Sequence, residues 1–364
     1  MKLSLPTDLL EDVLQVEEES ELADAILNEA YFAFSDEELS QARRFNEKGA
    51  SPSDAYKKVL IPLLDDEGKE ALAAVQVGYG LEEISPLDPY QYQADPYYQK
   101  VCKVMSKKTV IGPWTLEMKR YRPYELFVYD EVKVSPSSPF ACYSPLGFFK
   151  DAFPYPALSL KGTTYMSLIP HEMNTMAEAI SKAKGNVCTM GLGMGYFAFM
   201  ATEKEEVTSL TVLERDENVI SLFKKVFLPL FSHPEKVHIV RVEDALDYVV
   251  KEPFDYLFAD LHHDATDGLP LYIRILRKEG FAKEIDVWIE KAILSYFRRY
   301  VIALIEEESN GSSDKDYQAK ETEGDRVLSA LHFHLKNYEL KTEEQLVSLL
   351  SDDTLKSIAA TMKI

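Results

Sequence analysis

The chain has 364 residues, of which 46% are apolar and 28% are charged. These proportions are those of a folded globular protein, and they exclude a disordered, collagen-like or disulfide-scaffold chain. The three cysteines form no CxxC pair, so they predict neither a disulfide framework nor a zinc site. We find no targeting segment and no apolar run long enough to cross a membrane, and therefore expect a cytoplasmic protein without a membrane partner.

The net charge is −21, and residues 1–100 alone hold 22 acidic and 8 basic side chains. A protein that binds nucleic acid needs a basic surface, because neutralising phosphates supplies most of the affinity. The charge argues against a nucleic-acid partner and favours a neutral or cationic substrate.

The first 100 residues predict an acidic helical region, because apolar residues recur at helical spacing between acids. The acidic face is either solvated or a docking surface for a basic partner, and the helical region is also a candidate surface for a homodimer. Within this region, residues 86–100 are rich in proline and tyrosine and predict an irregular connector. Residues 101–165 then predict a β-rich module, with strands at 114–121 and 126–134.

Residues 166–305 alternate short apolar runs with amphipathic stretches of helical length, which predicts a doubly wound, mostly parallel α/β sheet. The expected strands lie at 187–190, 210–213, 237–240, 256–259 and 285–289. A polar run at 306–326 predicts a mobile loop, and residues 327–364 predict a helical tail.

The first of these strands runs into three alternate glycines, Gly191, Gly193 and Gly195, and then into a helix. Glycine lets the chain turn tightly and lets a ligand lie against bare backbone. A dinucleotide site requires G-x-G-x-x-G, but Tyr196 occupies the position of the third glycine. The pattern predicts a nucleoside-binding loop, with a purely structural glycine turn as the alternative.

The next two strands end in acids. Glu214 follows Gly195 by 19 residues, and an acid at the end of the second strand can accept hydrogen bonds from both ribose hydroxyls. Asp244 follows the third strand, where we expect contact with an adenine amino group. Glu243 competes for that role, and a helix N-cap is the other interpretation of Asp244.

The fourth strand ends in a polar cluster, Asp260, His262, His263 and Asp264. Ligands of open α/β sheets bind at the carboxyl edge of the strands, so this loop is expected to face the reaction. A histidine near its ordinary pKa suits proton transfer, although adjacent loop histidines also suit surface or capping roles. Four donors within five residues rarely close around one ion, so we predict no metal site.

Taken together, residues 163–290 resemble a class I S-adenosylmethionine-dependent methyltransferase with a Rossmann-like sheet, and are most similar to the spermidine synthase-like branch. Spermidine synthases carry a Glu-Met on the helix before their glycine loop, comparable to Glu172-Met173, and a β-rich module ahead of it. The resemblance implies bound S-adenosylmethionine and the following contact residues: Gly191, Leu192, Gly193, Met194, Gly195, Glu214, Arg215, Asp244, Ala245 and Asp260.

The departures from that branch favour methyl transfer. Met194 stands where spermidine synthases have an acid, His263 replaces the second acid of their loop after the fourth strand, and Asp264 falls one place late. Aminopropyl transfer needs carboxylates that hold and deprotonate a polyamine.

We therefore predict a methyltransferase acting on a small-molecule or protein acceptor, beneath a lid formed by residues 121–165. Methyl transfer mainly requires positioning of the acceptor and removal of its proton. The candidate groups for that work are His262, His263, Asp264 and Glu172. Two alternatives remain open: an aminopropyltransferase that uses decarboxylated S-adenosylmethionine, which the acidic charge favours, and a non-catalytic cofactor-binding or scaffold protein.

Overall fold

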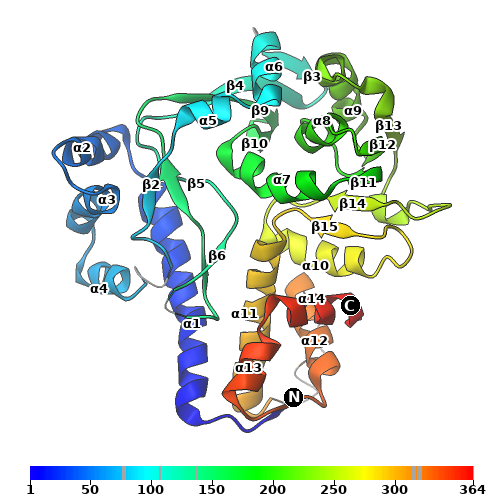
Figure 1. Cartoon of the computed structure of the whole chain (residues 1–364). Helices are drawn as coiled ribbons and strands as arrows, with labels where there is room; N and C mark the ends of the chain where they lie inside the picture. The colour runs from blue at the N-terminus through cyan, green and yellow to red at the C-terminus, as the bar shows by residue number, and fades with distance from the viewer. Residues whose placement is uncertain (76–78, 106–107, 137, 313–316, 318–321, 364) are drawn as a thin grey trace.

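The computed structural model describes residues 1–75, 79–105, 108–136, 138–312, 317 and 322–363. Its centre is a parallel sheet in the order β13-β12-β11-β14-β15 (Figure 1). The chain first fills the positions on one side of β11 and then returns to the other side, so the strand order reverses between β11 and β14. The strands are β11 (Gly185–Met190), β12 (Val207–Glu214), β13 (Val237–Arg241), β14 (Tyr256–Ala259) and β15 (Ile285–Val287).

Both faces of this sheet are buried. Val187, Tyr256 and Phe258 pack with α7 (Pro170–Lys182), α8 (Tyr196–Thr202) and α9 (Glu217–Leu222). The alternate residues Cys188, Leu257 and Ala259 pack on the opposite face, which α10 (Ala265–Leu276) and α11 (Glu290–Ser309) cover. Strands buried on both faces are nearly continuous apolar runs, which is why the sequence revealed them. The predicted Rossmann-like, doubly wound, parallel α/β fold is confirmed.

The fifth strand is shorter than the predicted 285–289. Ile289 has a backbone φ of +50°, in the left-handed region, and directly precedes α11. An extended strand cannot continue through that conformation. The strand therefore ends at Val287.

The helical N-terminal region is confirmed, with α1 (Thr7–Ala25), α2 (Asp36–Glu47), α3 (Pro52–Leu60) and α4 (Asp66–Val75). The predicted irregular connector is wrong, because it folds as α5 (Pro89–Gln93) and α6 (Pro96–Val104). Asp88 and Asp95 each accept a hydrogen bond from a backbone N–H of the first turn, and a proline follows each. An acid at the N-cap accepts a backbone N–H of the first turn, and a proline in the next position has no N–H that would be left unpaired. Together they are typical of the start of a helix.

The β-rich module contains an antiparallel sheet in the order β10-β9-β4-β3. Its strands are β3 (Thr109–Ile111), β4 (Trp114–Tyr121), β9 (Phe153–Leu160) and β10 (Thr163–Ser167), and β4 has the predicted bounds. Smaller sheets join β2 (Ile84–Pro86) and β5 (Phe127–Val128) to β8 (Leu146–Phe148), and β6 (Lys133–Val134) to β7 (Cys142–Tyr143).

The single strand predicted at 126–134 is therefore divided into β5 and β6. The Asp130 carboxylate accepts the Glu131 N–H at 2.8 Å, and the Glu131 carboxylate accepts the Val132 N–H at 3.2 Å. These local bonds use backbone donors that a continuous strand would give to its neighbour.

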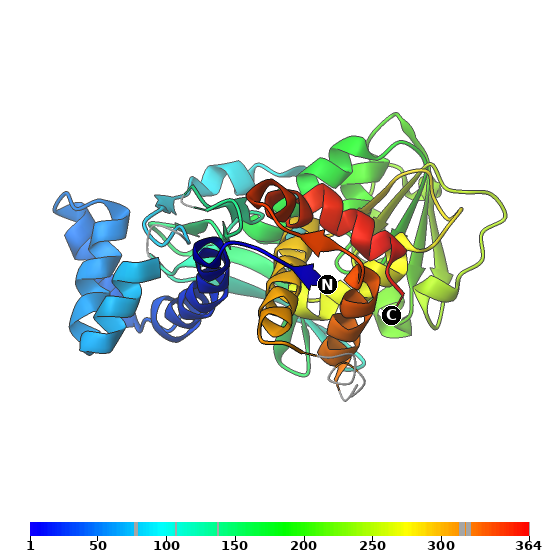
Figure 2. The same ribbon diagram turned by 90° about the horizontal axis from the view of Figure 1, so that it is seen from below.

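The C-terminal residues form α12 (Glu323–Leu335), β16 (Glu339–Leu340), α13 (Glu343–Leu349) and α14 (Asp352–Thr361), which confirms the helical tail. The two ends of the chain are joined. β16 pairs in parallel with β1 (Lys2–Leu3), and α1 lies along α11, where Arg299 contacts Glu17 at 3.0 Å and Asp24 at 3.4 Å (Figure 2). None of the described helices has the length and apolar character needed to cross a membrane.

The predicted domain boundaries need correction. Those placed after residues 100, 165, 305 and 326 fall inside α6, β10, α11 and α12 respectively. The predicted loop at 306–326 begins within α11 and ends within α12, while its residues 313–316 and 318–321 lie outside the described part of the chain.

Candidate functional site

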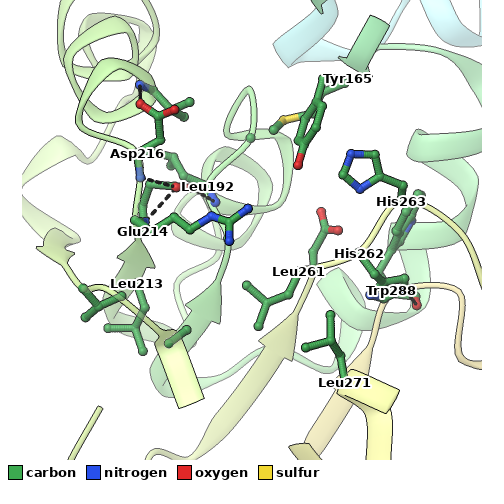
Figure 3. A pocket seen from close by; sticks show the side chains of 18 of the residues that line it. Tyr165, Leu192, Leu213, Glu214, Asp216, Leu261, His262, His263, Leu271 and Trp288 are labelled. Carbon is green, nitrogen blue, oxygen red and sulfur yellow. Dashed lines mark hydrogen bonds between the residues drawn. The ribbon is translucent and has the colours of Figure 1, made fainter. Parts of the chain in front are cut away.

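A cavity of about 390 Å³ lies at the carboxyl edge of the parallel sheet, beside the β11–β14 reversal. It is lined by the loops that follow β11, β12, β13 and β14, and by residues of β10 and α7. Figure 3 shows Glu214 and Leu192 on one side, and His262, His263 and Trp288 on the other. Ligands of doubly wound sheets bind at such a reversal.

The glycine loop needs its glycines for both conformation and space. Gly191 and Gly193 have φ of +92° and +56°. A Cβ on Gly191 would lie 2.0 Å from the carbonyl oxygen of Asp260, and one on Gly193 would lie 2.7 Å from Met166 Sδ. The backbone at Gly191, Leu192 and Gly193 lines the cavity without a side chain at either glycine, so a ligand can approach it closely.

The other two loop residues serve a different purpose. Met194 and Gly195 do not line the main cavity but a smaller one of about 30 Å³ behind the loop. The backbone carbonyl of Met194 accepts a hydrogen bond from the Tyr97 hydroxyl. A Cβ on Gly195 would lie 2.4 Å from the ring of Phe223. The third glycine therefore permits close helix packing.

Glu214 ties the end of β12 to the glycine loop. Its carboxylate accepts the backbone N–H of Leu192 at 3.1 Å, and those of Arg215 and Asp216 at 2.8 and 2.9 Å. A carboxylate has about four lone-pair sites, so accepting three N–H groups leaves at least one free. Glu214 and Arg215 both line the cavity, as the sequence predicted for a cofactor site.

Asp244 and Ala245 also line the cavity, together with Glu243. Asp244 caps the helical turn that begins at Ala245, accepting the Leu246 N–H at 2.8 Å, and pairs with Arg274 at 3.1 Å. Although burial opposes it, these contacts hold the pKa of Asp244 below its ordinary value. The capping interpretation is therefore observed, in a position that still borders the cavity.

Burial raises the pKa of two acids in the cavity wall, Glu172 and Asp260. Glu172 accepts hydrogen bonds from Ser167, at 2.9 Å from the N–H and 3.3 Å from the hydroxyl. Burial raises the pKa of Glu172 to about 8, and the nearby charge of Asp260 contributes. Burial also raises the pKa of Asp260 to about 7, with a contribution from Glu214. Either acid can release its proton to solvent near neutral pH when a cation binds beside it, because the positive charge favours the ionised carboxylate.

His262 is a core residue at the edge of the cavity. It is 6% exposed, and its Nε2 lies 3.0 Å from the carbonyl oxygen of Trp288. Its Nδ1 has no hydrogen-bond partner among the described residues. Burial lowers the pKa of His262, which keeps the ring neutral at neutral pH.

His263 and Asp264 have different surroundings. His263 lies at the cavity edge with its side chain 47% exposed, and its backbone N–H donates to Asp267 at 3.0 Å. Asp264 caps α10 in a capping box with Asp267 and does not line this cavity. Of the four candidate catalytic residues, the structure brings Glu172, His262 and His263 to the cavity wall and places Asp264 outside it.

Three aromatic residues of the wall were missed by the sequence analysis, Trp114, Tyr165 and Trp288. Trp114 Nε1 donates to the Asp216 carboxylate at 2.8 Å, and Tyr165 packs edge-on against Trp114 with ring centroids 5.1 Å apart. Trp288 Nε1 donates to Thr175 Oγ1 at 2.9 Å. Trp288 directly follows β15, so the rule that selected the ends of the other strands would have found it.

Among the described residues, no group of three or more His, Cys, Asp or Glu side chains is placed to hold a metal ion.

No protein-family model matches the sequence, and no curated protein matches it. Similar solved structures include a Thermoplasma acidophilum protein provisionally assigned as a methyltransferase, with 22% identity and a TM-score of 0.22 over 28% of this chain and 43% of that one. Spermidine synthase from Thermotoga maritima has 18% identity and a TM-score of 0.29 over 40% and 55%. A spermidine synthase in complex with the transition-state analogue AdoDATO has 16% identity and a TM-score of 0.29 over 40% and 54%. The chain spans about half the length of each of these structures.

Proposed function

We propose that the chain binds S-adenosylmethionine in the cavity at the sheet edge and transfers its methyl group to an acceptor. The observation that carries this proposal is the hydrogen bond from the Leu192 N–H to Glu214. It holds an acid at the end of the second strand, where such folds bind ribose, against a loop whose glycines have positive φ. This arrangement stands at the strand reversal, where doubly wound sheets bind nucleotides.

The residues present suit the ribose, the adenine and the cationic groups of that molecule. Glu214 would accept a hydrogen bond from a ribose hydroxyl at its remaining site, and Asp244 would accept one from the adenine amino group at the start of a helical turn. Glu172 and Asp260 would face the cationic end beside Gly191. When bound, S-adenosylmethionine supplies a methyl group on a sulfonium sulfur. The chain's own contribution is to hold an acceptor in line with that carbon and to exclude water.

Aminopropyl transfer is the second candidate, and a specific observation favours it. Glu172 and Asp260 both line the small cavity behind the glycine loop, and no lysine or arginine is among its described lining residues. Two acids without a basic partner favour an ammonium group over a carboxylate. Decarboxylated S-adenosylmethionine has that ammonium and lacks the carboxylate.

Calorimetric titration with the two cofactors tests both candidates. We expect micromolar binding of S-adenosylmethionine that weakens at least tenfold in Glu214→Ala. Glu205→Ala, which removes an exposed acid just before β12, is the matched control and should bind normally. Tighter binding of the decarboxylated form would favour aminopropyl transfer. Absence of binding by either cofactor would overturn the proposal and favour a structural glycine turn in a non-catalytic scaffold.

A further inference from the structure

A second cavity, of about 460 Å³, lies next to the cofactor cavity. The side chains of His263 and Trp288 line both. The remaining wall comes from the β-rich module, the segment after α1, the starts of α7 and α10, and the first turn of α11. Its volume is in the usual range for a small-molecule pocket, roughly 300–1,000 Å³.

The wall is mostly apolar and carries acids. Tyr121 and Phe127 stack with ring centroids 4.0 Å apart, and Phe32, Leu126 and Ile289 add apolar surface. The acids are Asp130, Glu131 and Asp264, and no lysine or arginine is among the described residues of the lining. Such a wall matches a ligand that has an apolar body and a positive charge.

Asp264 is committed elsewhere, because its carboxylate caps α10. The Glu131 carboxylate accepts the backbone N–H of Val132 at 3.2 Å and that of Ala292, which leaves accepting sites on its two oxygens. Burial raises the pKa of Glu131 to about 7, although the backbone hydrogen bonds from Val132 and Ala292 and the charge of Lys291 act to lower it. A buried acid of this kind gains from a cationic partner.

Two consecutive residues of α7 are divided between the two cavities. Glu172 lines the cofactor cavity, whereas His171 lines the second one. The His171 ring lies edge-on to Trp288 with centroids 6.0 Å apart. Burial lowers the pKa of His171 to about 4, so its ring carries no positive charge at neutral pH that would repel a cation. One turn of α7 and Trp288 therefore connect the two cavities.

We propose that the second cavity binds the acceptor of the transfer, and that this acceptor is an amine on an apolar, ring-sized body whose nitrogen contacts Glu131. The assignment of the bound molecule as an acceptor rests on the proposed function, whereas the binding of such an amine does not. Before the transfer, the bound ammonium releases one proton to solvent. The lone pair of the resulting neutral amine nitrogen then forms a bond to the sulfonium carbon. The carbon–sulfur bond breaks and leaves a neutral thioether. The resulting ammonium then releases one proton, which the Glu131 carboxylate accepts.

The tryptophans provide a direct assay. The chain has two, and Trp288 alone of them lines the second cavity. In a Trp114→Phe background the fluorescence reports on Trp288 only. We expect 2-phenylethylamine to change this emission saturably and to bind at least tenfold more tightly than its neutral analogue 2-phenylethanol. Glu131→Gln should abolish that preference, and Glu37→Gln, an exposed acid on α2, should preserve it.

A second variant covers the case in which Glu131→Gln does not fold. Ala292→Phe fills the cavity from α11 and should exclude the amine while the circular dichroism spectrum stays native. Equal binding of the amine and the alcohol would overturn the inference, and so would 1,4-diaminobutane binding as tightly as 2-phenylethylamine. S-adenosylmethionine binding is measured by calorimetry on the chain that keeps Trp114, because Trp114 lines the cavity proposed for the cofactor. Cofactor binding without amine binding defeats only the inference, and amine binding without cofactor binding defeats only the proposed function.

Discussion

The ring of Tyr165 meets the imidazole of His263 edge-on, with centroids 4.1 Å apart and planes at 87°. Tyr165 belongs to β10 of the β-rich module, and His263 belongs to the loop after β14 (Figure 3). Both line the cavity at the carboxyl edge of the sheet, which we propose binds the cofactor. The module that the sequence analysis predicted to be a lid thus contacts the carboxyl edge of the sheet through aromatic rings.

Removing this contact should weaken cofactor binding. An aromatic pair contributes about 0.5–1.5 kcal/mol beyond its buried area, so we expect Tyr165→Ala to raise the dissociation constant of S-adenosylmethionine by roughly two- to tenfold. Tyr165→Phe keeps the ring and should bind almost normally. Tyr90, which is 72% exposed, provides the control Tyr90→Ala. Unchanged affinity in Tyr165→Ala would show that the contact does not support the cavity.

Two glycines with nearly the same positive φ separate the effect of backbone strain from that of crowding. Gly191 and Gly162 have φ of +92° and +93°, but a Cβ on Gly162 would meet nothing within 4 Å, whereas one on Gly191 would lie 2.0 Å from the Asp260 carbonyl oxygen. Gly162→Ala should cost about 1–2 kcal/mol of unfolding free energy, the cost of the left-handed conformation. Gly191→Ala should cost more, because Asp260 is held by its N–H bond to Met190 at 2.8 Å. Urea unfolding measures the free energy of unfolding of both variants. Equal losses would contradict the expectation that a Cβ at Gly191 clashes with Asp260.

The residues at the carboxyl edge of the sheet show which features can be predicted from the sequence and which cannot. The strands and the acids at their ends were predictable, because burial on both faces makes apolar runs and parallel strands end at one edge. The hydrogen-bond partners of side chains near those ends were not, since Trp114 reaches Asp216 from 102 positions away and Trp288 reaches His262 from 26. Spacing along the chain gives the edge on which a residue lies, whereas its hydrogen bonds depend on segments that only the fold brings together.

The buried acid Glu172 should make stability fall as the pH rises. Burial raises its pKa from 4.5 to about 8, so between these values the folded chain keeps a proton that the unfolded chain has released. The folded state then binds more protons, and its stability decreases with pH by up to about 1.4 kcal/mol per unit. Glu172→Gln keeps an oxygen for Ser167 and removes the titration. Its unfolding free energy relative to wild type should rise from pH 5 to 8. Glu178→Gln, an exposed acid on the same helix, is the control.

The same acids should make cofactor binding release protons. A sulfonium cation favours the ionised forms of Glu172 and Asp260, whose pKa values are raised to about 8 and about 7. The affinity for S-adenosylmethionine should therefore increase from pH 6 to 8, and binding should release up to one proton per acid. Calorimetry in buffers of different ionisation enthalpy counts these protons. Neutral 5′-methylthioadenosine should release fewer, and tighter cofactor binding at pH 6 than at pH 8 would contradict this account.

His262 should show the opposite pH dependence, which distinguishes a core histidine from a proton-transfer residue. Burial lowers its pKa below 6.5, so the unfolded chain binds a proton that the folded chain does not, and stability falls as the pH decreases through 6.5. His262→Gln keeps a donor for the Trp288 carbonyl and cannot titrate in this range. Relative to wild type, its unfolding free energy should rise below pH 6.5. Methyl transfer should persist in this variant, because the ring nitrogen near Trp288 serves packing and the other one is buried. Loss of transfer with unchanged stability and cofactor affinity would instead assign His262 to the reaction.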